Sequence, residues 1–345
     1  MPQDGAPPAE AFVITGNCSY RFANDGWTWF INTYGNQITT KDITKINYMF
    51  TDCQHLESIP FEINGKSNTN MSLDSIFYHC YELKSIPKMI GIRVSDNSSF
   101  MGGCQNIREI PEDIENWFDW SYIDNLTASY AGARSQIFAY CFSLRSIPMG
   151  FLAHGNPVAS YSSSIFYNTF NNCFTLDEII DLPNPHINAT WTSNAFSNPF
   201  TRCMRLKNMT FKMPDGAPYI VNWKNQTIDL SSYVGYSQSD NYITGYNSGL
   251  TADTRITDDA SYQALKDNPD SWTTGINYSR YNKTSAVATI NSLPDASAYL
   301  ATAGGTNTIK FKGASGALTD GGAINTLTEE EIAVATAKGW SVAFV

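Results

Sequence analysis

The phrase FYHCYELKSIP runs from Phe77 to Pro87. Much the same phrase occurs earlier as FTDCQHLESIP (residues 50–60) and later as FAYCFSLRSIP (residues 138–148). Aligned on cysteine, six related segments centre on Cys53, Cys80, Cys104, Cys141, Cys173 and Cys203. Successive cysteines lie 24 to 37 residues apart. This recurrence predicts a repeat architecture, in which each unit buries its apolar side against its neighbours.

Two patterns flank each cysteine. Ahead of it, apolar residues fall at i, i+3, i+4 and i+7, as at Leu73, Ile76, Phe77 and Cys80, which is typical of one face of a helix. After it, leucine and isoleucine lead into a proline that ends regular pairing, so we expect a short strand there. Stacked units should bury a structural ladder of equivalent side chains. The ladder comprises Phe50, Cys53, Leu56, Phe77, Cys80, Leu83, Cys104, Phe138, Cys141, Leu144, Phe170, Cys173, Phe200 and Cys203.

The expected fold class is an α/β repeat solenoid, with short helices on one side, a parallel sheet on the other and a cap at both ends. We divide the chain into an N-terminal tail and cap (1–40), the repeats (41–215), an irregular segment rich in Tyr, Ser and Asn (216–282) and a C-terminal cap (283–345). Cys18 marks a degenerate earlier unit. The C-terminal cap should read helix, strand, helix, strand. In it, Thr328 and Glu331 have capping-box spacing and Gly339 follows the last helix.

The segments MFTDCQHLESIP, IFYHCYELKSIP and IFAYCFSLRSIP resemble the leucine-rich repeats of BspA-like surface proteins, which are common in Bacteroidales and related gut and oral bacteria. The resemblance covers roughly residues 40–215. It implies a right-handed leucine-rich-repeat solenoid that works by binding and adhesion, with no catalytic residues to carry over. The pattern departs at Ile180, which stands where proline is expected, and at Pro214, which comes late; we expect distorted units there. The C-terminal segment is similar to the ends of structural proteins of gut Bacteroides phages, including crAss-like ones.

Charge and composition exclude several classes of partner. The formal net charge of -10 argues against nucleic-acid binding, which needs a basic face, and against docking to an anionic membrane. No apolar run approaches membrane-spanning length. The first residues lack the basic start and apolar stretch of a secretory signal. Either the protein is not exported by that route, or its export segment lies outside this sequence.

The sequence offers no constellation for catalysis, a cofactor or a metal. No Cys-x-x-Cys spacing occurs, and His55 and His79 sit beside ladder cysteines that belong to the apolar stripe. Buried, unpaired thiols are therefore the better interpretation of the cysteines. We predict no catalytic residues, no metal and no cofactor.

Aromatic insertions are the candidate binding surface, because the ladder positions are committed to the core. The candidates are Trp117, Phe118, Trp120, Tyr122 and Tyr130 in one insertion, and Tyr233, Tyr236, Tyr242 and Tyr246 in the other. Such rings suit stacking on sugars or anchoring a protein. The alternative is that the first group buries itself against the repeats and that the second belongs to an ordinary spacer.

Three functional classes remain open at this point. The first is a virion protein of a bacteriophage, assembled in the host cytoplasm, that presents its repeats for attachment to the host or to the particle; the free cysteines fit that route. The second is a bacterial cell-surface adhesion protein. The third is an enzyme such as a polysaccharide-cleaving β-helix, which the helical stripe and the scattered acidic residues disfavour. Expected partners are virion or cell-surface proteins, or a host surface glycan or protein. The sequence does not specify an oligomeric state.

Overall fold

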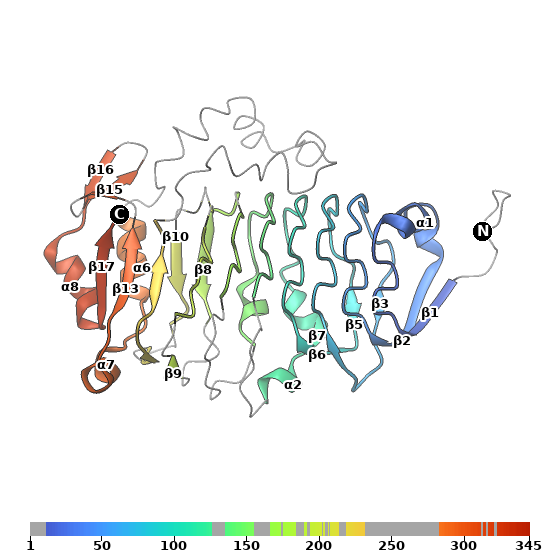
Figure 1. Cartoon of the computed structure of the whole chain (residues 1–345), viewed down its shortest axis with the longest axis horizontal. Coiled ribbons are helices and arrows are strands. Elements are labelled where there is room, and N and C mark those ends of the chain that lie inside the picture. The colour runs from blue at the N-terminus through green and yellow to red at the C-terminus, as the bar shows by residue number, and fades with distance from the viewer. Residues whose placement is uncertain are drawn as a thin grey trace.

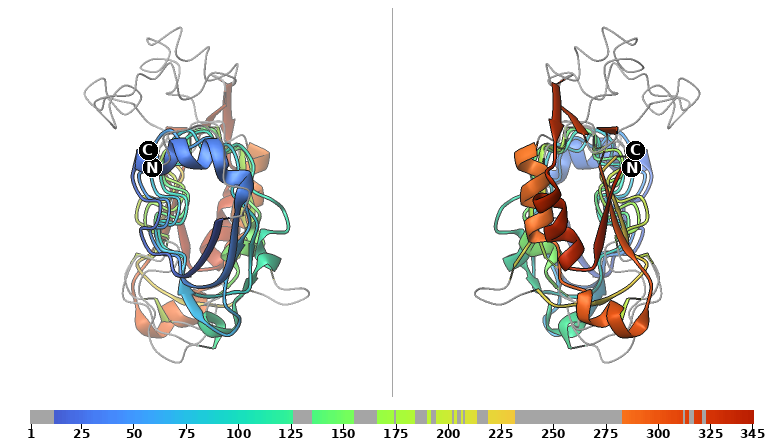
Figure 2. Two further views of the ribbon diagram at one scale, coloured as in Figure 1. Left: turned by 90° about the vertical axis from the view of Figure 1, so that its right-hand side faces the viewer. Right: turned by 90° about the vertical axis from the view of Figure 1, so that its left-hand side faces the viewer.

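The computed structural model shows an elongated α/β molecule with short helices and several small parallel sheets (Figure 1). The structure describes a set of ranges interrupted by gaps. These are residues 12–125, 135–154, 166–173, 175–183, 190–191, 194–201, 203, 206, 208–213, 219–231, 283–311, 313–314, 317–320 and 323–345. Consecutive segments lie side by side in sequence order along the long axis, and the views along that axis show them superimposed (Figure 2).

Parallel pairing joins strands from neighbouring segments of the chain. The sheets are β1 (Phe12–Asn17) with β2 (Ile38–Lys45), β3 (Ile63–Asn64) with β5 (Met89–Ile90), β4 (Asn70–Ser72) with β6 (Ile92–Asp96) and β7 (Phe118–Asp119), β8 (Glu178–Leu182) with β10 (Asn208–Phe211), β9 (Thr190–Trp191) with β11 (Asn222–Trp223), and β12 (Thr227–Asp229) with β13 (Asn307–Phe311) and β17 (Trp340–Phe344). One antiparallel sheet comprises β14 (Gly313–Ala314), β15 (Ala317–Asp320) and β16 (Ala323–Thr326). The expected single parallel sheet is thus divided into several sheets of two or three strands.

The described helices are short. The α-helices are α1 (Thr28–Tyr34), α2 (Ser121–Asp124), α6 (Lys283–Ser292), α7 (Ser297–Ala303) and α8 (Glu329–Ala337). Single 3₁₀ turns are η1 (Asp25–Trp27), η2 (Gly35–Gln37), η3 (Ile114–Trp117) and η4 (Met149–Leu152). Among the described residues, no helix has both the length and the apolar character needed to cross a membrane.

Where the structure describes the stretches before the cysteines, it shows pairs of four-residue turns in place of the expected helices. In residues 46–53, the Met49 amide donates to Ile46 O (3.0 Å) and the Cys53 amide donates to Phe50 O (3.2 Å). The third residue of each turn, Tyr48 or Asp52, has a left-handed φ of 58°, which a helix interior does not contain. The first and fourth residues of each turn are buried. Two consecutive turns therefore reproduce the spacing i, i+3, i+4, i+7 without a helix.

These turn pairs, which we call the turn segments, recur along the described chain. They occupy residues 18–25, 46–53, 73–80, 97–104, 135–141, 166–173 and 196–203, the last without residue 202. Each donates backbone hydrogen bonds to the next: the amides of Tyr48, Phe50 and Asp52 donate to the carbonyls of residues 74, 76 and 78 at 2.8–3.0 Å. The first turn segment, which lies ahead of the aligned cysteines, has the same left-handed positions at Tyr20 and Asn24, but its Arg21 is exposed and its Asp25, which begins η1, is half-buried.

Strands were also expected directly after the cysteines. They are found in the segments that lack the early proline and not in those that contain it. Residues 54–60 and 81–87 contain no strand, because Pro60 and Pro87 lack the amide that a ladder requires. Where Ile180 replaces the proline and Pro214 comes late, the corresponding segments pair as β8 and β10. These two segments therefore form strands, and the expected distortion is present as a register shift between Met209 and Phe211 and a left-handed φ of 57° at Asp181.

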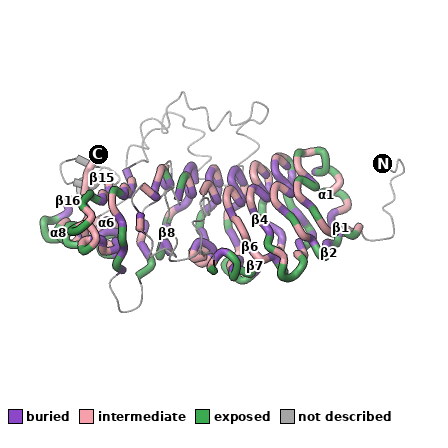
Figure 3. Tube along the Cα trace, turned by 60° about the horizontal axis from the view of Figure 1, so that its bottom comes forward, coloured by how far each residue is buried: buried purple, intermediate pink, exposed green. Residues whose placement is uncertain are grey.

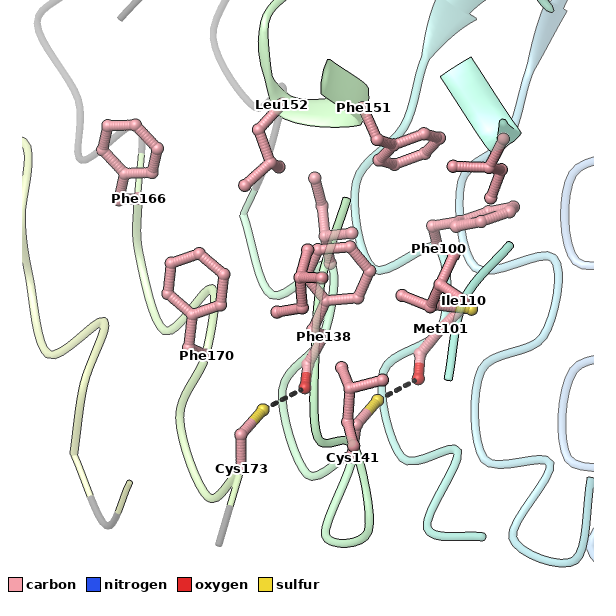
Figure 4. Close-up of a cluster of buried hydrophobic side chains, with 14 of the residues drawn as sticks. Phe100, Met101, Ile110, Phe138, Cys141, Phe151, Leu152, Phe166, Phe170 and Cys173 are labelled. Carbon is pink, nitrogen blue, oxygen red and sulfur yellow. Dashed lines mark hydrogen bonds between the residues drawn. The ribbon is translucent and has the colours of Figure 1, made fainter. Parts of the chain in front are cut away.

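Every predicted ladder side chain is fully or almost fully buried, with an exposed fraction of 1% or less. The phenylalanine rings stack from segment to segment, with centroids 5.8 Å apart for Phe50 and Phe77 and 5.9 Å apart for Phe170 and Phe200. Met101 interrupts the rings, and there Phe100 and Phe151 fill the interior (Figure 4). Buried and exposed stretches alternate along the described chain (Figure 3).

The C-terminal elements confirm the expected order of helix, strand, helix and strand in α6, β13, α8 and β17, with α7 and the antiparallel sheet added. Thr328 caps α8: its side chain accepts from the Glu331 amide (3.2 Å), and the Glu331 carboxylate accepts from the Thr328 amide (2.7 Å). Gly339 follows with a φ of 81°. These elements lie at the end of the molecule opposite β1 and α1 (Figure 1).

Candidate functional site

Three residues of the first predicted binding group are buried, so the expectation that Trp117, Phe118 and Trp120 form a free surface is wrong. Trp117, Phe118 and Trp120 expose 9%, 8% and 6% of their surface. The Trp120 indole N–H donates to Glu115 O (2.7 Å), and its ring packs edge-on against Phe151 at 5.3 Å. These rings fill the interior beside the turn segments, which was the alternative interpretation.

The remaining candidates divide into one exposed residue and several undescribed ones. Tyr122, on α2, exposes 39% of its surface. The others, Tyr130, Tyr233, Tyr236, Tyr242 and Tyr246, lie outside the described residues. Among the described candidates, Tyr122 is therefore the exposed one.

The cysteines at Cys53, Cys80, Cys104, Cys141, Cys173 and Cys203, which we call the cysteine row, are buried and free. Each thiol donates to a carbonyl of the preceding turn segment at 2.9–3.1 Å, as Cys141 does to Met101 O and Cys173 to Phe138 O (Figure 4). The same carbonyl also accepts the amide of its own segment, such as Cys53 N–H to Phe50 O. Cys18 does not belong to this row, since it begins a turn segment and its thiol faces Thr15 O at 3.9 Å.

Burial makes these thiols poor nucleophiles. It raises the pKa of the Cys141 thiol to about 12 and that of Cys53 to about 12, where the charges of Asp25 and Asp52 add to the effect. The pKa values of Cys80, Cys104, Cys173 and Cys203 are raised by the same desolvation. The thiolate is the reactive form, so the row is suited to packing and to hydrogen bonding and not to chemistry.

The described histidines are likewise engaged with the preceding segment. His55 Nδ1 lies 2.8 Å from an Asp25 carboxylate oxygen, and His79 Nδ1 lies 2.9 Å from Asp52. His154 follows the same rule with Asp124 at 3.0 Å, and its ring stacks on Trp120. Within the described ranges, no three His, Cys, Asp or Glu side chains gather to hold a metal ion.

The turns present an ordered surface along the described segments. The second and third residues of each turn lie between its ends, which are mostly buried, and we call these positions the turn face. They are Ser19, Tyr20, Ala23, Asn24, Asn47, Tyr48, Thr51, Asp52, Asp74, Ser75, Tyr78, His79, Ser98, Ser99, Gly102, Gly103, Ser135, Gln136, Ala139, Tyr140, Tyr167, Asn168, Asn171, Asn172, Ser197, Asn198 and Thr201. Serine, asparagine and tyrosine dominate this set. Most of its members are exposed or half-buried, whereas Thr51, Ser75, Gly102, Gly103, Ala139, Asn171 and Asn172 are buried.

Charge is almost absent from the described turn face. Its acidic residues are Asp52, which pairs with His79, and Asp74, which accepts the Tyr48 hydroxyl at 2.7 Å. This hydrogen bond, with burial and the Asp74 charge adding to it, raises the pKa of Tyr48 to about 12. No described position on this face is lysine or arginine. The described turn-face positions therefore carry little charge, while the exposed Arg21, which ends the first turn, lies beside them.

Tyrosine rings lie on this face in defined positions. Tyr20 and Tyr48 stack with centroids 4.7 Å apart and an interplanar angle of 2°. Tyr20 and Tyr167 expose 57% and 41% of their surface. The Tyr78 ring lies against Gly102, where a Cβ would approach its Cδ2 to 3.0 Å. Glycine at this position therefore makes room for the ring.

The turn face was not predicted from the sequence, although a signal for it exists. Two small polar or tyrosine residues recur between the apolar pairs of each segment, as Asn47-Tyr48 and Thr51-Asp52 do between Ile46 and Cys53. Asn, Asp, Ser and Gly in such positions are typical of turns with left-handed residues. The helical interpretation assigned these residues to a solvated helix side, where they carry no special meaning.

Comparison with known proteins gives no relative: no family model, no curated protein and no solved structure matches this chain. Its function has to be inferred from its own residues and geometry.

Proposed function

We propose that this chain is a non-enzymatic binding and structural module. In this proposal its segments are leucine-rich repeats of the BspA-like kind, stacked as a solenoid and closed at both ends. The observation that carries the proposal is where the thiol and imidazole side chains lie and what they bond to. The buried thiols and the described histidines bond to the neighbouring segment, while most of the described turn-face positions are exposed or half-buried. Such a division suits a protein that recognises a partner over an extended area.

The same proposal places the protein on a bacteriophage particle, where it serves attachment to the host or to the rest of the particle. The similarity of its C-terminal segment to phage structural proteins supports this placement. The free thiols support it too, because they fit assembly in a reducing cytoplasm. The second candidate is a bacterial cell-surface adhesion protein, which the BspA-like resemblance supports equally well.

Mass spectrometry of purified virions and of purified host envelope separates the two placements. We expect peptides of this chain to be enriched in the virions; enrichment in the envelope would favour the bacterial protein. The binding role needs a second experiment, in which the fluorescently labelled full chain is added to intact Bacteroidales cells and to purified particles. Saturable binding to either supports the proposal. Binding to neither, together with turnover of a polysaccharide, would contradict it.

A further inference from the structure

We propose that the turn face binds an uncharged polysaccharide, laid along the stacked turn segments. This inference rests on the proposed binding function and adds the surface and the chemical class of the ligand. It differs from the expectation that aromatic insertions hold the site, because Trp117, Phe118 and Trp120 are buried.

The charge of the surface selects the ligand. A nucleic acid or an acidic polysaccharide would require lysine and arginine, and the described turn face has neither. The carboxylates of Asp52 and Asp74 are hydrogen-bonded to His79 and Tyr48, which leaves amides and hydroxyls as the main polar groups. Amides and hydroxyls both donate and accept, as sugar hydroxyls do. An uncharged, hydroxyl-rich polymer is therefore the complementary partner.

The exposed tyrosines supply the apolar part of the contact. Tyrosine has a rigid ring with a polar tip and suits surfaces that are apolar at one end and wet at the other. Tyr20 is held by its stack on Tyr48, and Tyr78 is held against Gly102. Rings fixed in this way lose little conformational freedom when a sugar ring stacks on them.

The backbone makes this surface rigid and regular. Amides in one segment donate to carbonyls in the next across the whole turn face, for example Gly103 to Ala139 O (2.7 Å), Tyr140 to Asn171 O (2.7 Å) and Asn172 to Thr201 O (2.8 Å). Chains paired in this way lie about 4.8 Å apart. Tyr20 and Tyr167 are separated by five such steps, or about 24 Å. A polymer with a short repeat can contact several segments at once, so we expect longer oligomers to bind more tightly than short ones.

A protein partner fits this surface less well. The anchors of protein interfaces are tryptophan, tyrosine and arginine that fill pockets, surrounded by an apolar core. The described turn-face positions include no tryptophan, arginine or large aliphatic residue, and the arginine beside them is Arg21 at the end of the first turn. Tyrosine is present, but it is accompanied by serine and asparagine.

The test uses the full chain and an array of immobilised oligosaccharides. The array carries neutral gluco-, manno- and galacto-oligomers of increasing length beside sulfated and uronic-acid-containing ones. The variants are Tyr20→Ala and Tyr167→Ala, and the control is Tyr122→Ala, whose exposed fraction of 39% matches the 41% of Tyr167 but which lies off the turn face. Circular dichroism and melting temperature establish that each variant is folded.

We expect binding to at least one neutral series, with little change when salt is raised. Tyr20→Ala and Tyr167→Ala should each weaken it by about tenfold or more, the effect of a contact hot spot. Tyr122→Ala should change it by no more than about twofold, as surface substitutions do.

Several outcomes would overturn the inference. Binding only to anionic oligomers, with loss at high salt, would show that charge outside the turn face selects the ligand. Capture of a protein, and of no oligosaccharide, through Tyr167 would assign the face to a protein partner. If the chain binds host cells and the Tyr20 and Tyr167 variants do so equally, the binding function stands and the turn face is not its site. If it binds no oligosaccharide, no cell and no particle, the proposed function fails as well.

Discussion

Raising the pH should unfold this protein through its cysteine row. The six thiols are buried, and desolvation keeps their native pKa values well above the value of about 8.5 for a free cysteine. The native state therefore holds these protons where the unfolded chain releases them. Because the unfolded state then binds fewer protons, the free energy of unfolding falls as the pH rises. This stability is fully present below about pH 8.5 and is lost as the pH approaches the native pKa values.

The size of the effect follows from the number of thiols. At pH 9.5, one unit above the unfolded pKa, each protonated native thiol costs about 1.4 kcal/mol, and six cost about 8 kcal/mol. That is comparable to the whole stability of a typical domain, about 5–15 kcal/mol. Tyr48, with a native pKa of about 12, adds to the loss only above about pH 10, the unfolded value for tyrosine.

Urea denaturation at pH 7.5 and pH 9.5, in the presence of a reductant, measures this loss. We expect the midpoint to fall steeply, and Cys141→Ala to reduce the pH-dependent loss by about one sixth, because one of the six thiols is removed. If the midpoint at pH 9.5 equals that at pH 7.5, the thiols ionise in the folded protein and the account of a sealed cysteine row is wrong.

Three further predictions concern the packing and the turns. Gly103→Ala should lower the free energy of unfolding by about 2 kcal/mol or more, because Gly103 has a φ of 85° and a Cβ there would lie 2.8 Å from His79 Cδ2. The control Gly102→Ala should lower it by less. Equal losses in urea denaturation would argue against strain at Gly103. Trp120→Ala should cost about 3–5 kcal/mol as a buried aromatic deletion, and an unchanged melting temperature would place this ring outside the core. Thr328→Ala should lower the free energy of unfolding by about 1 kcal/mol, because the N-cap of α8 is lost. Thr328→Ser should keep most of this stability. Identical urea midpoints for wild type and Thr328→Ala would mean that the cap contributes nothing.

The buried positions were predictable from the sequence, but the backbone that buries them was not. Ile46, Met49, Phe50 and Cys53 were correctly assigned to the interior. Their spacing is shared by a helix and by two consecutive four-residue turns, so periodicity alone cannot separate the two. The deciding evidence is local. The third residue of each described turn has a left-handed backbone, and some of these positions hold residues such as Asn24 and Gly103 that adopt it readily.

The candidate site was the harder part to predict. Phe118 and Trp120 pack against Phe151, a residue more than thirty positions away that fills the gap where Met101 replaces a ring. No local pattern reveals such a contact. The turn face likewise arises only when successive segments are superimposed, which places Tyr20 beside Tyr48 across 28 residues.

The most direct test of the binding account is hydroxyl-radical footprinting of the full chain, with and without saturating host envelope or particle preparations. Side-chain oxidation is read for each tyrosine and tryptophan by mass spectrometry. The account predicts that Tyr20, Tyr48 and Tyr167 become protected when the partner is bound, while Tyr122 and the exposed Trp29 are oxidised at the same rate as before. Protection of Tyr122 or Trp29, with unchanged oxidation of the turn-face tyrosines, would contradict it.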